Sequence, residues 1–121
     1  ESAFAKRSRH PVFTTLQYHE LREILPERKP TQPRHVACDD CHEVHFITSR
    51  DPFGYVTGFS SDRVPLKRAV NEYEVCYKCH SESANLPGNQ KDKRLQFQPE
   101  NPSMHPVEAV GRNTNVPSLI P

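Results

Sequence analysis

Two short motifs combine the cysteines of this chain with two of its histidines. The sequences CDDCH (38–42) and CYKCH (76–80) each place two thiols three positions apart, with an imidazole directly after the second thiol. Two thiols at this spacing form thioether bonds to the two vinyl groups of a haem, and the following histidine binds the haem iron from one side. The predicted thioether residues are Cys38, Cys41, Cys76 and Cys79. The predicted proximal iron ligands are His42 and His80.

Four cysteines are also compatible with a zinc site, a redox-active dithiol or two disulfides. A four-cysteine zinc ribbon usually separates its pairs by about 15–20 residues, and Cys41 and Cys76 are much further apart. Zinc gives no reason for a histidine after both pairs. A thioredoxin-like dithiol needs alternating strands and helices, which the sequence does not predict, and two disulfides would leave a weakly apolar chain with little to hold it together. Two covalently bound haems c are therefore the favoured cofactors.

The composition agrees with a cofactor at the centre of the fold. The chain has 121 residues, of which 34% are hydrophobic, with 12 prolines and no tryptophan, and its mean hydropathy is -0.81. This length fits one domain, but the apolar content is low for a domain that must bury its own core. A haem is large, flat and mostly apolar, so it would supply the missing interior.

The attachment motifs must lie on helical turns, because Cys at i, Cys at i+3 and His at i+4 then share one side. We expect one or two such turns over 38–45. A longer helix is predicted over 65–80, with Ser61 or Asp62 as its N-cap and Pro65 in its first turn. Its apolar residues recur at spacings of three and four, which directs one face of the helix toward the second motif.

The remaining sequence predicts little regular structure. A short helix is expected over 14–25, and a loop or weak hairpin over 46–59 with its turn at 51–54. The predicted fold class is mainly α with much irregular coil: a small c-type cytochrome domain organised by haem. Residues 1–121 form this single domain, with an extended N-terminal segment (1–34) and an extended C-terminal segment (84–121).

The residues around the motifs resemble a known family. The stretch CDDCHEVH (38–45), followed after a loop by VCYKCH (75–80), resembles the doubled Cys-x-x-Cys-His family of multihaem c-type cytochromes. The resemblance covers residues 35–81, with one pair of motifs and no glycine directly after the added histidine, His45. It implies an exported electron carrier with closely packed haems and histidine on both sides of each iron.

The second axial position of each iron determines whether a haem transfers electrons or binds a substrate. His45 lies too close to His42 to reach the far side of the same iron, but it could bind the iron of the second haem, a role that the resemblance supports. His105 precedes a proline that fixes the backbone beyond it. The predicted distal ligands are therefore His45 and His105, and the alternatives are His10, in a similar His-Pro-Val context, and His35. The single methionine, Met104, is expected to pack against a haem face.

Two haems with histidine on both sides predict one-electron transfer at low reduction potential rather than catalysis. An alternative is a protomer of an extracellular cytochrome filament or multi-subunit assembly, in which one chain donates a distal histidine to the next. A peroxidase or small-molecule reductase would need an open iron, which the surplus of histidines disfavours. The expected partners are redox proteins or other cytochromes.

Charge and hydropathy exclude other partners. Sixteen basic and fifteen acidic residues are mixed along the chain, giving a net charge of +1, which does not favour nucleic acid. No apolar run is long enough for a transmembrane helix, and the first residues, ESAF, do not resemble a signal peptide. Because bacteria and archaea attach c-type haem outside the cytoplasm, the resemblance implies a periplasmic, cell-surface or extracellular location.

Overall fold

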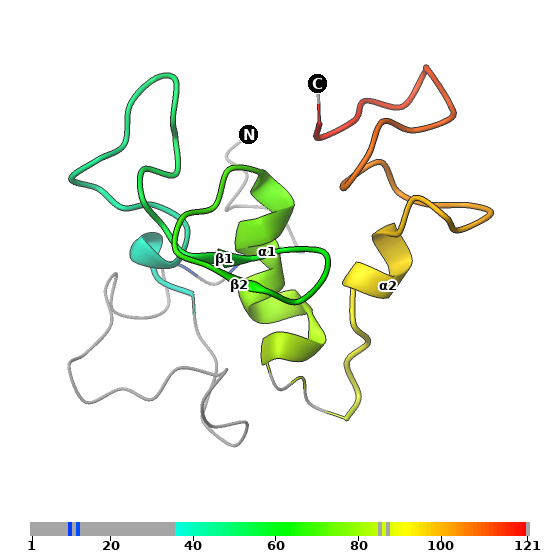
Figure 1. Ribbon diagram of the computed structural model, residues 1–121, viewed down its shortest axis with the longest axis horizontal. Helices are drawn as coiled ribbons and strands as arrows, with labels where there is room; N and C mark the ends of the chain where they lie inside the picture. Colours follow the sequence, from blue (N-terminus) through cyan, green and yellow to red (C-terminus); the bar gives the residue numbers. More distant parts are fainter. Residues whose placement is uncertain (1–9, 11, 13–35, 85, 87, 121) are drawn as a thin grey trace.

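The computed structural model describes residues 10, 12, 36–84, 86 and 88–120 (Figure 1). Short elements connected by long loops make up this part of the chain. In chain order they are the 3-10 helix η2 (Cys38–Asp40), the strands β1 (Gly58–Phe59) and β2 (Pro65–Leu66), the helix α1 (Glu72–His80), the 3-10 helix η3 (Glu82–Ala84) and the helix α2 (Arg94–Phe97). The helix predicted over 14–25 lies outside the described residues.

Helix α1 begins later than the sequence predicts. Its N-cap is Asn71, which has an extended backbone. The Glu74 carboxylate turns back to accept the backbone N–H groups of Val70 at 2.6 Å and Asn71 at 2.9 Å. An acidic side chain in the first turn thus satisfies N–H groups that lie before the helix. The prediction of a helix from 65, capped by Ser61 or Asp62, was wrong.

The segment before α1 forms a two-stranded antiparallel hairpin instead. Gly58 pairs with Leu66 and Phe59 with Pro65. Proline lacks an N–H group, so it is tolerated at the first position of an edge strand. A Cβ at Gly58 would lie 2.9 Å from the Glu74 carbonyl oxygen, so the missing side chain allows β1 to approach α1 closely.

The loop between η2 and the hairpin contains the turn predicted at 51–54. Gly54 has a φ of +66°, in the left-handed region that favours glycine. The Asp51 Oδ1 atom accepts the N–H groups of Phe53 at 3.3 Å and Gly54 at 3.0 Å, which closes the turn. The prediction of a turn at these four residues is confirmed.

The hydrophobic core of the described residues is small. Val56, Ala69 and Val75 form a cluster, with the partly buried Cys41 and Phe53 against it. Exposed large apolar side chains are more numerous: Val44, Phe46, Ile47, Tyr55, Val64, Val70, Leu95, Val110, Val116 and Leu119. Much apolar surface of this chain therefore lies outside the core.

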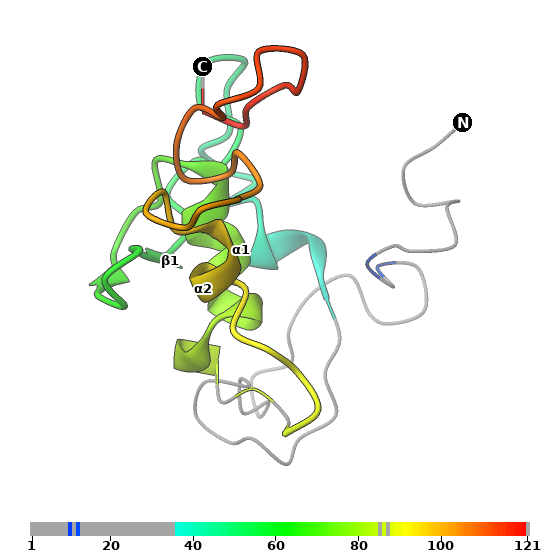
Figure 2. The same ribbon diagram turned by 90° about the vertical axis from the view of Figure 1, so that its right-hand side faces the viewer.

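In Figure 1, η2 lies on one side of α1 and the C-terminal segment lies on the other side. Figure 2, turned by 90°, shows α2 in front of α1 in the same arrangement. The buried Tyr77 hydroxyl donates a hydrogen bond to the Glu108 carboxylate, which ties this segment to α1. Apart from the short α2, which the sequence did not predict, residues 86 and 88–120 contain no helix or strand.

Candidate haem-attachment sites

The first Cys-x-x-Cys-His motif forms a helical turn, as expected. The carbonyl oxygen of Cys38 accepts the N–H groups of Cys41 at 3.3 Å and of His42 at 3.0 Å. Cys38 is exposed and Cys41 is partly buried. The hydrogen bonds bring the backbone of Cys41 and His42 back over Cys38, the arrangement that attachment to one haem edge requires.

His42 is oriented by a hydrogen bond that the sequence did not predict. Its Nδ1 atom lies 2.7 Å from the carbonyl oxygen of Pro52. A carbonyl oxygen only accepts, so Nδ1 carries the proton and Nε2 keeps the lone pair that binds a metal. This is the usual support of a metal-binding histidine. The sequence predicted the turn that contains Pro52, but no sequence signal connects this carbonyl to His42.

The second motif occupies the last turn and a half of α1. The helix buries Glu74, Val75 and Tyr77. Cys76 and His80 are exposed, and Cys79 is partly buried. Because Cys76 and His80 are four residues apart, they lie on the same side of the helix, away from its buried face. That side can accept a large flat group without displacing the core.

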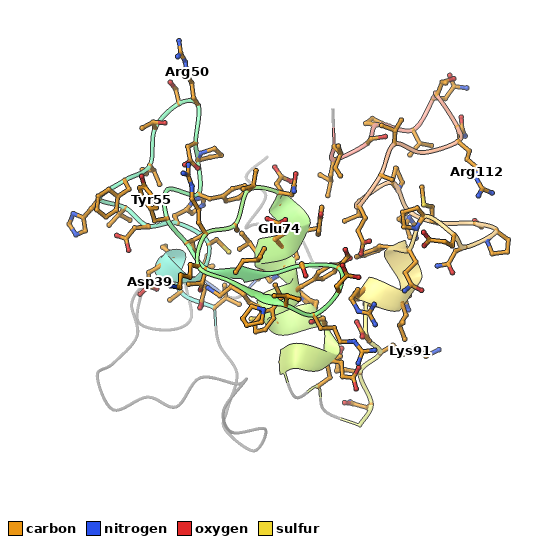
Figure 3. All side chains as sticks on the ribbon, viewed as in Figure 1. Asp39, Arg50, Tyr55, Glu74, Lys91 and Arg112 are labelled. Atoms are coloured by element: carbon orange, nitrogen blue, oxygen red, sulfur yellow. The ribbon has the colours of Figure 1, made fainter. Side chains whose placement is uncertain are left out.

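The two motifs lie next to each other. Lys78 Nζ, in the second motif, donates a hydrogen bond of 2.8 Å to the carbonyl oxygen of Asp40, in the first. In Figure 3, Asp39 of the first motif lies to one side of α1, the helix that carries Glu74. Lys78 therefore bridges the two motifs, a role that its variable position within the motif did not reveal.

The surroundings of the Cys41 and Cys76 thiols raise the pKa of both. Burial raises the pKa of the Cys41 thiol, and the nearby Asp40 carboxylate raises it further, while the Lys78 cation acts in the opposite direction. Cys76 is exposed to solvent. Desolvation by the surrounding protein atoms still raises the pKa of its thiol, and the nearby Cys41 thiol raises it further. Both groups therefore favour the neutral thiol. All four cysteines belong to the described residues, and no disulfide joins them.

The predicted distal histidines lie in different places. The ring of His10 lies beside that of His80, with 5.9 Å between ring centres. His45 is exposed in a turn, where its backbone N–H faces a Glu43 carboxylate oxygen at 3.5 Å. His105 packs edge-on against Phe97, with 6.2 Å between ring centres. His35 lies outside the described residues.

A pocket of about 300 Å³ surrounds part of the C-terminal segment. Met104, His105 and Arg112 contribute to its lining. None of the cysteines of the two motifs lines it, so the expectation that Met104 packs against a haem face gains no support from this pocket. The axial role predicted for His105 stays a prediction.

A haem and a compact metal site make different demands on the side chains around the motifs. Within the part of the chain that the structure describes, no three His, Cys, Asp or Glu side chains gather where they could hold a metal ion. A four-thiolate zinc site needs all four ligands around one point. A haem at each motif would need two thiols, an oriented imidazole and open space. The His42–Pro52 hydrogen bond orients the imidazole of the first motif, and the exposed side of α1 leaves space beside the second.

Comparisons with protein-family models, with curated proteins and with solved structures found no match to this chain. Among the described residues, no helix is both long enough and apolar enough to cross a membrane.

Proposed function

We propose that this chain is a dihaem c-type cytochrome that transfers one electron through each of two covalently bound haems. The observation that carries the proposal is the presence of two complete Cys-x-x-Cys-His motifs on neighbouring helical turns. The proposed domain is mainly α with much irregular coil, organised by its cofactors. It acts as an electron carrier and not as an enzyme.

The residues of each motif have separate roles. Cys38 and Cys41 would hold the first haem, and Cys76 and Cys79 the second. His42 and His80 would bind the two irons, and the Pro52 carbonyl keeps His42 in the tautomer that presents Nε2. When bound, a haem supplies reversible one-electron exchange at its iron. The chain contributes ligand choice, burial and the spacing between the haems.

The contact between the motifs supports rapid exchange between the haems. The Lys78 hydrogen bond to the Asp40 carbonyl keeps the two attachment turns side by side. Two haems attached to these turns would be closely packed, so an electron that enters at one would pass to the other within the same chain. The proposed partners are redox proteins or other cytochromes, and the proposed location is periplasmic, cell-surface or extracellular.

Counting the haem that remains with the denatured chain tests the proposal. After extraction with acidified acetone, the alkaline pyridine spectrum should show two haems per polypeptide. The C38A/C41A and C76A/C79A variants should each retain one haem. No retained haem in the unsubstituted protein would overturn the proposal, and zinc in the native sample would support the metal-binding alternative.

A second candidate function is a protomer of a cytochrome filament or multi-subunit assembly. The exposed side chains of Val110, Val116 and Leu119 on the C-terminal segment favour it, because exposed apolar surface is typical of contacts between chains. The same segment carries the exposed His105. Sedimentation over a range of concentrations should then show association, and dilution should open one haem iron. A monomer whose two irons stay fully ligated at high dilution would contradict this alternative.

A further inference from the structure

The imidazole of His10 lies beside that of His80, although the two residues are far apart in the sequence. Their ring centres are 5.9 Å apart and their planes are tilted by 39°. Both residues are exposed, so a tightly packed core does not force this contact. His80 is the proposed iron ligand of the second motif. A second imidazole beside it could bind the same iron.

The separation of the rings fits one metal ion between them. An imidazole nitrogen binds a transition metal at roughly 2.0 Å, so two imidazoles on opposite sides of one ion have ring centres about 6 Å apart. The two rings are already at this separation. We propose that His10 is the second axial ligand of the iron that His80 binds, an assignment that rests on the proposed dihaem function.

An apolar side chain close to His10 in the sequence is buried. Val12, two residues further on, is only 8% exposed. The ring of His10 itself is exposed, and so are Cys76 and His80 on α1, so this side of the helix is open to a haem.

The other described histidines have different neighbours. His45 is exposed, and its backbone N–H donates a local hydrogen bond to a Glu43 carboxylate oxygen. The ring of His105 contacts Phe97. Among the described histidines, His10 is the one whose ring lies against that of His80. The contact therefore reverses the order of preference that the sequence suggested for the second haem, where His45 ranked before His10.

The spin state of the two irons in the holoprotein tests this assignment. In H10A the haem count should remain two per chain, while one of the two ferric irons becomes high-spin and one reduced haem binds carbon monoxide. Added imidazole should return that iron to the low-spin state. Two low-spin irons in H10A, with two haems retained, would overturn the assignment of His10 and leave the dihaem function intact. Absence of covalent haem in the unsubstituted protein would overturn both.

Single-haem variants show which iron is affected. H10A in the C38A/C41A background, which keeps only the second haem, should open that iron. H10A in the C76A/C79A background is the matched control and should leave the first haem unchanged. Opening of the first haem instead would contradict the assignment.

H10M provides a test that does not depend on losing a ligand. Methionine ligation raises the reduction potential of a haem. One of the two potentials in H10M should therefore rise while the other stays within error. Two unchanged potentials would contradict the assignment even if H10A fails to fold.

Discussion

His42 and Lys78 obtain their proposed roles from backbone carbonyl groups. The Pro52 carbonyl selects the tautomer of His42, and the Asp40 carbonyl fixes the ammonium group of Lys78 beside the first motif. Side-chain types and spacing predict which groups bind a haem, because thioether and iron bonds require particular atoms. They do not predict these carbonyl partners, since every residue has a carbonyl and only the folded path of the chain brings one within reach.

Replacing Lys78 should lower the reduction potential of the first haem. A nearby cation favours the reduced iron, which carries less positive charge. Lys78 is partly buried and close to the first attachment site: burial raises the pKa of the Cys41 thiol, and the Lys78 cation acts against this rise. We expect K78Q to lower one potential by about 20–60 mV, since 59 mV corresponds to a tenfold change for one electron. Spectroelectrochemical titration measures the shift.

Two variants control for this effect. K78R keeps the positive charge and should leave the potential close to its original value. K91Q removes the charge of an exposed lysine and should change neither potential. A K91Q shift as large as that of K78Q would mean that net charge, and not the position of Lys78, sets the potential.

Tyr77 should make the fold sensitive to alkaline pH. Burial raises the pKa of its phenol, and the hydrogen bond to Glu108 and the charge of that carboxylate raise it further. Above the ordinary tyrosine pKa of about 10, the unfolded chain therefore loses this proton while the folded chain keeps it. The free energy of unfolding should fall as pH rises through this range, by up to about 1.4 kcal/mol per pH unit. The contribution of Tyr77 to the free energy of unfolding is fully present below pH 10.

The Y77F variant tests this pH dependence. It should cost about 1–2 kcal/mol at pH 7, because Glu108 loses its partner, and it should reduce the loss of stability between pH 10 and 11. Denaturant unfolding at several pH values gives both quantities. Y55F removes the hydroxyl of an exposed tyrosine and should keep the steeper alkaline slope. An equally steep slope in Y77F would show that other groups cause it.

At the scale of elements, local sequence patterns predicted where a turn or helix lies better than they predicted where a helix begins. The turn at 51–54 was predictable because Asp and Gly in this order satisfy the turn by themselves. The end of α1 was predictable from the attachment motif. Its start was not. The residues before α1 have helical periodicity, but Leu66 pairs with Gly58 in a hairpin, and Glu74 accepts the N–H group of Val70 just before the helix. The short α2 carries no strong periodic signal in its four residues.

Substitution of Gly54 should disturb both the loop and the first haem site. An alanine Cβ would lie 2.9 Å from the Glu43 carbonyl oxygen, and the φ of +66° is unfavourable for alanine. We expect G54A to lower the free energy of unfolding by about 1–3 kcal/mol. Because the same turn holds the Pro52 carbonyl against His42, the spectrum of the first haem should also become heterogeneous.

Gly88 provides a matched comparison for this substitution. A Cβ there would meet no atom within 4 Å. G88A should therefore unfold at the same denaturant concentration as the original protein and keep its haem spectrum. Equal stability of the two variants would contradict the role given to Gly54.

At the scale of the whole molecule, the described residues bury few large apolar side chains. Seven hydrophobic residues are buried among those described, and three of these are alanines. In the same part of the chain, ten large hydrophobic side chains are exposed. The low hydropathy predicted a small core. The packing of particular side chains against a haem could not be predicted, because it depends on an apolar surface that the sequence does not contain.

The compactness of the protein should therefore depend on haem attachment. A folded chain of 121 residues has a radius of gyration of about 14 Å, and an unfolded chain of this length about 36 Å. We expect the holoprotein to be close to the first value, and the C38A/C41A/C76A/C79A variant, which cannot attach haem, to be clearly expanded. Small-angle X-ray scattering measures both. The two single-motif variants should have intermediate values, because each keeps one haem. A haem-free variant as compact as the holoprotein would show that the small core is sufficient by itself, and the haems would then serve electron transfer without organising the fold.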